Sequence, residues 1–291
     1  MKGILLAGGN STRLYPTTLC VNKHLLPIYD KPMIYYSLSI LMMAGVRDIL
    51  VVSTPTTIGS MQSLLGTGEQ WGIQLSYAIQ SRPRGIADVF LVGEGFIDGS
   101  KILVVLGDNV IYGHDLPAQL QKAALFEEGA VIFAYSVGDP TRYGVVEFDC
   151  DKRVIGIEEK PTVPKSNYAI PGVYLYDNQV VDIAHNLTPS ARGELEITDV
   201  NKVYLQRGML DVMVIGRGTA WLDTGTPESL LQASNYVQTV QERQGVLVAS
   251  PEEIAYSMGY ISFDQLRVLS DRLKSSVYGK RLLQIKEMVS T

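Results

Sequence analysis

The stretch GILLAGGNSTRLYP, residues 3–16, joins an apolar run to a pair of glycines and then to a polar segment containing Arg13. An isolated double glycine most often marks a plain turn between a strand and a helix. The same residues also suit an anion cradle, in which backbone N–H groups around Gly8 and Gly9 face a phosphate and the Arg13 guanidinium closes over it. Both interpretations stay open on this stretch alone, so the remainder of the chain has to separate them.

Outward from this stretch, apolar strand-like runs alternate with helix-like segments. The strand candidates of the first half are residues 2–7, 47–54, 73–80 and 101–108, and the helix candidates are residues 33–45, 58–66 and 85–96. Strands that alternate with helices predict a Rossmann-like α/β fold, a mixed and mostly parallel sheet with helices on both faces.

The pattern changes in the second half of the chain. Strand candidates follow one another with little helix between them, at residues 130–137, 143–149, 153–160 and 167–177. This run predicts a β extension packed against the parallel core. Helix candidates at 197–208 and 227–245 flank a strand candidate at 211–218, and short helices are expected from Pro251 onward. No repeat or clear linker interrupts the chain, which predicts one compact unit.

Composition and charge exclude several classes of protein. The chain has 291 residues, of which 46% are hydrophobic, and a net charge of −5. Such a balance argues against a nucleic-acid or membrane-surface partner, since either would favour a basic face. Cys20 and Cys150 form no spaced pair, no secretory signal or membrane-spanning run is expected, and a cytoplasmic protein with reduced thiols is predicted. Three histidines and no CxxC argue against a zinc site.

Two of the predicted strands end in polar, glycine-marked sequence, GGNSTR after residue 7 and GDN at 107–109. The carboxyl ends of neighbouring parallel strands meet at one edge of the sheet, so Asp108 is expected to face the cradle around Gly8, Gly9 and Arg13. A phosphate cradle beside a carboxylate suits a magnesium-nucleotide complex. The chain lacks GxxxxGK[ST] and GxGxxG, which argues against P-loop NTPases and nicotinamide dehydrogenases.

Further polar clusters lie at EEKP (158–161), ARGELEITD (191–199) and WLDTGTP (221–227). Each has a plain structural interpretation: a solvated strand end, a helix-capping region and an N-capping turn, respectively. Each also offers charged groups that could hold an anion or a metal.

Taken in order, GGNSTRLYP, NKHLLPIYDKPMIYY, GDN, YGVVEF, EEKP, SNYA, SARGELEITD and AWLDTGT resemble the glucose-1-phosphate thymidylyltransferases, a group of sugar-phosphate nucleotidyltransferases. The resemblance runs from residue 1 to about residue 288. It implies that the phosphate of glucose 1-phosphate attacks the α-phosphorus of dTTP in line, without a covalent enzyme intermediate, giving dTDP-glucose and pyrophosphate for deoxysugar synthesis of the dTDP-rhamnose type. Cation clamps and positioning would carry most of the catalysis.

The resemblance also implies residue roles. Arg13, Lys23, Asp108 and Asp223 are expected to be catalytic, the two aspartates by holding Mg²⁺. The nucleotide would bind to Gly8, Gly9, Ser11, Thr12, Arg13, Gln80, Pro83, Gly85, Ile86 and Asp108. The sugar phosphate would bind to Tyr143, Gly144, Glu159, Lys160, Ile170, Arg192 and Trp221. A division into a nucleotide-binding core (1–128), a sugar-phosphate part (129–226) and a helical part for subunit contacts and feedback regulation (227–291), in a homotetramer, follows from the same resemblance.

Some positions depart from the family's usual residues. GGSGTRL becomes GGNSTRL, so Asn10 and Ser11 differ, and a positive φ at Ser11 would carry strain. SKQ becomes NKH, changing Asn22 and His24, and the base-side segment PRGIADV brings in Arg84 and Asp88. The phosphate and metal residues are intact, whereas the surroundings of the base differ. Three alternatives therefore stay open: another nucleoside triphosphate, another sugar or cyclitol phosphate, or a non-catalytic regulator that binds nucleotide-sugars.

Overall fold

The central feature of the fold is a ten-stranded sheet with the order β10-β9-β11-β8-β12-β6-β1-β4-β5, to which β13 adds beside β8. The computed structural model describes residues 1–9 and 11–286; the predicted departure at Asn10 lies outside them. Four strands run parallel, namely β1 (Lys2–Ala7), β4 (Asp48–Ser53), β5 (Gln74–Ile79) and β6 (Ile102–Leu106). The expected mixed, mostly parallel α/β sheet is confirmed.

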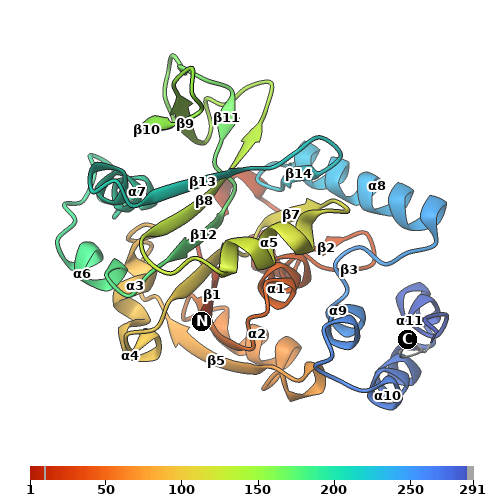
Figure 1. The fold of residues 1–291 in the computed structure, drawn as a ribbon. Coiled ribbons are helices and arrows are strands. Elements are labelled where there is room, and N and C mark those ends of the chain that lie inside the picture. Colours follow the sequence, from red (N-terminus) through yellow and green to blue (C-terminus); the bar gives the residue numbers. More distant parts are fainter. Residues whose placement is uncertain (10, 287–291) are drawn as a thin grey trace.

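The predicted β extension is part of this same sheet. Strands β8 (Ala130–Ser136) and β12 (Val173–Tyr176) continue it beyond β6, while β13 (Leu210–Val214) pairs in parallel with β8. Strands β9 (Gly144–Phe148), β10 (Val154–Glu159) and β11 (Tyr168–Ala169) project from the body at the top of Figure 1. The extension therefore forms one wall above the carboxyl edge of the parallel strands.

The prediction of one strand over residues 167–177 is wrong, because the chain turns between β11 and β12. Pro171 has no N–H to donate to a ladder. Gly172 lies so close to Asn109 that a Cβ atom on it would stand 2.3 Å from the Asn109 amide nitrogen. The turn therefore brings the backbone of the extension against the end of β6.

Helices cover both faces of the sheet, as expected. Alternate residues of one strand point to opposite faces, so that Leu5 packs with α1 and Ile4 packs on the other side. The first face carries α1 (Ile34–Met43), α2 (Ile58–Leu65) and α5 (Leu116–Ala124). The second carries α3 (Asp88–Val92), α4 (Glu94–Ile97), α6 (Val180–His185) and α7 (Ile197–Gln206). The single helix predicted over 85–96 is instead broken at Gly93.

A second, two-stranded sheet joins β7 (Asn109–Tyr112) to β14 (Ala220–Asp223) in antiparallel pairing. Neither strand was expected, since 221–227 was predicted as an N-capping turn and no strand was predicted over residues 109–112. Strands β2 (Pro27–Ile28) and β3 (Lys31–Pro32) form a further pair. Helix α8 (Pro227–Gln244) packs against these elements through a small apolar cluster that includes Ile28, Val110 and Val237.

The chain closes with three short helices, α9 (Pro251–Ser257), α10 (Phe263–Leu273) and α11 (Val277–Leu282), at the right of Figure 1. The helix predicted from residue 278 ends at Leu282, and its last predicted residues lie outside the described part. Three 3₁₀ turns complete the structure: Thr12–Leu14, Lys23–Leu25 and Glu69–Trp71. Among residues 1–9 and 11–286, no helix is long and apolar enough to cross a membrane.

Candidate active site

The carboxyl ends of β1 and β6 form the floor of a cleft. The Gly107 backbone N–H donates to the carbonyl of Leu6 at 2.8 Å, so the residues after the two strands lie together. Asp108 follows directly and forms an ion pair with Lys23. Burial alone would raise the pKa of Asp108, but the Lys23 ammonium and its hydrogen bond outweigh burial and lower it. Asp108 is thus a carboxylate held in its charged form at the cleft floor.

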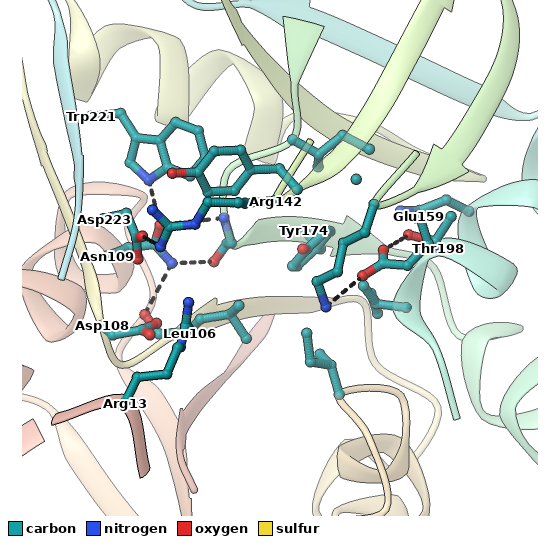
Figure 2. Close-up of a pocket in the computed structure, with 18 residues that line it drawn as sticks. Arg13, Leu106, Asp108, Asn109, Arg142, Glu159, Tyr174, Thr198, Trp221 and Asp223 are labelled. Atoms are coloured by element: carbon teal, nitrogen blue, oxygen red, sulfur yellow. Dashed lines mark hydrogen bonds and ion pairs between the residues drawn. The ribbon is translucent and has the colours of Figure 1, made fainter. Parts of the chain in front are cut away.

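A second aspartate reaches the same place from the other end of the chain. The antiparallel register of β14 and β7 sets Asp223 opposite Asn109, the neighbour of Asp108. The Thr224 hydroxyl donates to the carbonyl of Asp108 at 3.0 Å. The Asp223 carboxylate accepts from Arg142 at 2.8 Å (Figure 2). Two carboxylates from distant segments therefore face one cleft, each beside a cation.

These two carboxylates fit a magnesium ion. Mg²⁺ takes one or two protein carboxylates and completes its octahedron with phosphate oxygens and water. No group of three or more His, Cys, Asp or Glu side chains suited to a metal occurs in the part of the chain that the structure describes, so the donor set matches neither a zinc site nor an all-protein cage.

The described part of the loop after β1 contains two residues with positive φ. Gly9 has φ 88°, a left-handed conformation that glycine adopts without steric cost. Ser11 also has a positive φ, 49°, so the strain expected from the sequence is present. Arg13 follows in the 3₁₀ turn that begins at Thr12. Its guanidinium lies beside Asp223: a Cβ atom built on Gly225 would stand 2.9 Å from Arg13 Nη2 and 3.1 Å from Asp223 Oδ1.

One half of the cleft, with a volume of about 230 Å³, is bounded by the glycine loop and the segment after β5. Several of the residues expected to hold the nucleotide line it, namely Gly8, Gly9, Gln80, Pro83, Gly85, Ile86 and Asp108, and so does Lys23, expected to be catalytic. Arg13 lines the other half of the cleft. Ser11 lies instead on a neighbouring hollow that Gly9 and Lys23 share. Gln80 is 5% exposed and donates its amide N–H groups to Asp88 Oδ2 at 2.9 Å and to the carbonyl of Gly85 at 3.3 Å.

His24, which also lines this half, is completely buried beside Lys23. Its Nδ1 lies 2.7 Å from the Asn22 side-chain oxygen, an acceptor, so Nδ1 carries the proton. Burial, reinforced by the charge of Lys23 and partly opposed by Asp108, lowers the pKa of His24 to about 3. The imidazole is therefore neutral at ordinary pH.

The other half of the cleft, about 180 Å³, lies between β14 and the β9–β10 wall. The residues expected to hold the sugar line it: Tyr143, Gly144, Glu159, Lys160, Ile170 and Trp221. The ring centroids of Tyr143 and Trp221 lie 4.9 Å apart, and the two rings form one side of the cavity. Figure 2 shows Glu159 across the cavity, where Thr198 donates to it at 2.5 Å and Lys160 Nζ lies 3.1 Å away. Asp108 lines both halves, so the two cavities are one continuous cleft.

Arg192, expected to bind the sugar phosphate, lines the half bounded by the glycine loop together with Glu159 and Lys160, and it does not line the other half. Its guanidinium lies 2.8 Å from Glu196 and 3.6 Å from Glu159. It therefore sits near the junction of the two halves, held by carboxylates.

Arg142, Asn109 and Thr198 are among the cleft residues that were not predicted. The Asn109 amide donates to the carbonyls of Leu106 and Gly172 and accepts from Trp221 Nε1 at 2.8 Å and from the Gly172 N–H. A signal existed for each residue, because Arg142 precedes Tyr143, Asn109 completes the GDN motif and Thr198 lies within EITD. Their contacts, however, depend on pairings between distant strands.

Comparison with known proteins shows the family of the chain. The model of a nucleotidyl transferase family matches residues 2–240. A glucose-1-phosphate thymidylyltransferase from Mycolicibacterium smegmatis is 53% identical over 98% of this chain and 99% of its own, and one from Neisseria meningitidis is 52% identical over the same shares. A crystal structure of a Bacillus anthracis protein assigned as a glucose-1-phosphate thymidylyltransferase, in complex with sucrose, is 41% identical, with a TM-score of 0.76 over 81% of this chain and 94% of that chain.

The resemblance found in the sequence is thereby confirmed over almost the whole length of the chain. A structure of UDP-glucose pyrophosphorylase with UDP-glucose, 24% identical, shares the fold, with a TM-score of 0.72 over 82% of this chain and 98% of its own. On these matches, the chain belongs to the nucleotidyl transferase family and, within it, to the glucose-1-phosphate thymidylyltransferases.

Proposed function

We propose that this chain transfers a thymidylyl group from dTTP to glucose 1-phosphate, forming dTDP-glucose and pyrophosphate in a magnesium-dependent reaction. The observation that carries the proposal is the pair Asp108 and Asp223, which come from distant parts of the chain and line the same half of the cleft, with Asp108 also lining the other half. One half would take the nucleotide and the other the sugar phosphate. A cation bound at the junction would offset the repulsion between the two anionic reactants.

The nucleotide would enter the half bounded by Gly8 and Gly9, with its triphosphate against the backbone N–H groups of the loop. Arg13 and Lys23 would neutralise the phosphates and the departing pyrophosphate. Asp108 and Asp223 would hold Mg²⁺, which supplies charge neutralisation and orientation for both phosphate groups when bound. Ser11 and Thr12 would complete the loop, and Gln80, Pro83, Gly85 and Ile86 the base pocket.

The sugar phosphate would occupy the half between β14 and β9–β10. Glu159 would accept hydrogen bonds from sugar hydroxyls, its carboxylate already oriented by Thr198. Lys160 and Arg192 would bind the phosphate of the sugar, and Tyr143 and Trp221 would pack against the ring, beside Gly144 and Ile170. Held in this way, a phosphate oxygen forms the new bond to the α-phosphorus while the bond to the bridging oxygen of pyrophosphate breaks.

The test is the assay of pyrophosphate release with dTTP, Mg²⁺ and glucose 1-phosphate. Release that requires all three supports the proposal, and no release with any nucleoside triphosphate or sugar phosphate would indicate a binding protein without turnover. A competition assay across dTTP, UTP, ATP, GTP and CTP, with several sugar and cyclitol phosphates, then identifies the substrates. Equal rates with dTTP and ATP would contradict the base pocket assigned here.

The further parts of the proposal concern assembly and location. Residues 1–128 would form the nucleotide core, 129–226 the sugar-phosphate part and 227–291 the contacts of a feedback-regulated homotetramer. Exposed Leu231, Val268 and Val277 on α8, α10 and α11 support subunit contacts through these helices. The exposed, unpaired Cys20 and Cys150 suit the reducing cytoplasm, and the product would feed deoxysugar synthesis. Light scattering of the purified chain tests the tetramer.

A further inference from the structure

Asp88 holds the Gln80 side chain in a single orientation. Asp88 is 1% exposed, at the start of α3, and its Oδ2 accepts from Gln80 Nε2 at 2.9 Å. Its other oxygen, Oδ1, forms an ion pair with Arg84 Nη2 at 2.7 Å, and a carboxylate offers only acceptors. The second N–H of the Gln80 amide faces the carbonyl of Gly85 at 3.3 Å.

Both groups that face the Gln80 amide nitrogen are therefore acceptors. A flipped amide would place its oxygen against a carboxylate and a carbonyl, with no proton between them, in a buried site. Gln80 Oε1 consequently points away from Asp88 and from the Gly85 carbonyl. It lies beside Gly8 on the wall of the nucleotide half, 3.2 Å from where a Cβ of that glycine would stand.

We infer that Asp88 is a specificity-positioning residue, which makes Gln80 present a bare acceptor to the nucleotide base and so selects a base with a ring N–H. The inference rests on the proposed function for the placement of the base in this half of the cleft. Thymine carries its sugar on N1, so N3–H is its one ring donor and matches Gln80 Oε1. Cytosine is nearly the same size but has a lone pair at N3, which would face the oxygen unpaired.

The test compares the dissociation constants of dTTP and dCTP, measured by calorimetry on the intact protein, with the kcat/KM values for the same nucleotides. The amide of Asp88→Asn can donate as well as accept, so only the Gly85 carbonyl, at 3.3 Å, still favours the original orientation of Gln80. We expect the preference for dTTP over dCTP to fall about 10- to 100-fold, the cost of one unpaired buried polar group. Asp88→Ser, which can also donate or accept, is the second variant should the first fail to fold.

Asp177→Asn is the matched control. Asp177 is also buried and accepts from the Gly129 N–H at 2.8 Å and from Tyr204 at 2.7 Å, but it follows β12 at the end remote from the cleft. This variant is expected to lose stability and keep the base preference. A double variant of Asp88→Asn with Gln80→Ala should show no loss beyond Gln80→Ala alone, because Asp88 acts through Gln80.

Any one of three results would overturn the inference. The Asp88→Asn variant could keep the preference for dTTP over dCTP, the double variant could show additive losses, or the wild-type protein could show no such preference. Failure of the proposed function gives a different result. In that case the protein releases no pyrophosphate, while calorimetry still reports whether Asp88 sets the base preference.

Discussion

The Thr224 hydroxyl donates to the backbone carbonyl of Asp108 at 3.0 Å, which fixes the segment that carries Asp223 to the segment that carries Asp108. Thr224 is fully buried, and its neighbour Asp223 lies in register with Asn109. The separation of the two carboxylates is thus set by backbone pairing rather than by flexible side chains. A metal held between them would meet two carboxylates whose backbone segments are already fixed, and it would compete with Lys23 and Arg142 for them.

Asp223→Asn should lower kcat at least about 100-fold, because metal stabilisation of the transition state is worth several kcal/mol. The amide has the same shape, so the thermal unfolding midpoint should stay nearly unchanged. Pyrophosphate release at saturating Mg²⁺ measures the loss, and Asp211→Asn, on exposed β13, is the control. Near-normal turnover would place the metal elsewhere.

Arg142→Gln should lower the Mg²⁺ concentration for half-maximal activity about two- to fivefold. Arg142 lies 2.8 Å from Asp223 in the free protein and competes there with a metal ion, but the pair is partly exposed and weakened by solvent. Magnesium titrations of the rate measure the shift, with Arg217→Gln in an exposed loop as control. A requirement that rises instead would mean that Arg142 assists metal binding.

Lys160→Ala should raise the KM for glucose 1-phosphate about 10- to 100-fold, the loss of one charge-assisted hydrogen bond to phosphate. The KM for dTTP should change little. Initial rates with each substrate varied in turn separate the two effects. Lys165→Ala removes an exposed lysine that pairs with Glu147 outside this cleft, and it should leave both constants unchanged. An effect confined to dTTP would reassign Lys160.

Ser11→Gly should raise the free energy of unfolding by up to about 1 kcal/mol, because φ 49° strains any residue with a Cβ, an effect partly offset by the greater freedom of glycine in the unfolded chain. Thr12→Gly, at the neighbouring position inside the 3₁₀ turn, should have the opposite sign. Urea unfolding of the two variants gives the comparison. Destabilisation by both would show that the Ser11 side chain makes contacts that outweigh the strain.

His24 should make the metal-free protein sensitive to acid. Its pKa falls from 6.5 to about 3 on folding, so below pH 6.5 the unfolded chain binds a proton that the folded chain does not. Stability should therefore fall as the pH drops from 6.5 towards 3, by roughly 2–4 kcal/mol in all. His24→Gln should flatten this part of the stability profile in EDTA, whereas His114→Gln, at an exposed position, should not. Equal slopes would mean that His24 is already protonated in the folded protein.

Local pattern predicted much of this architecture. The apolar runs at 2–7, 47–54 and 101–108 are strands, and the segment at 33–45 contains α1. The strain at Ser11 was expected for a positive φ there, because the resembled family usually has glycine at this position, and the structure has φ 49°. Such features depend on neighbours in the sequence, which is why sequence reasoning reaches them.

Other features depend on pairing across the fold and were missed. The β7–β14 pair sets Asp223 in register with Asn109, whereas the sequence of β14 alone predicted a turn and no strand was predicted for β7. The contact between Arg142 and Asp223 likewise requires the β9 wall to stand over β14. Motif similarity still predicted Asp108 and Asp223 as site residues. A family motif carries over the roles of residues that the fold brings together, without predicting the strand pairing that does so.

Asn109 uses both amide hydrogens and both lone pairs of its oxygen on three separate stretches: the end of β6, Gly172 and Trp221. An amide so fully engaged has no rotamer left to lose when a sugar arrives. The aromatic wall and the floor of the cavity are therefore ordered when the chain folds rather than when substrate binds. The conformational entropy of this half of the cleft is lost once, when the chain folds, and substrate binding does not reduce it again at each turnover.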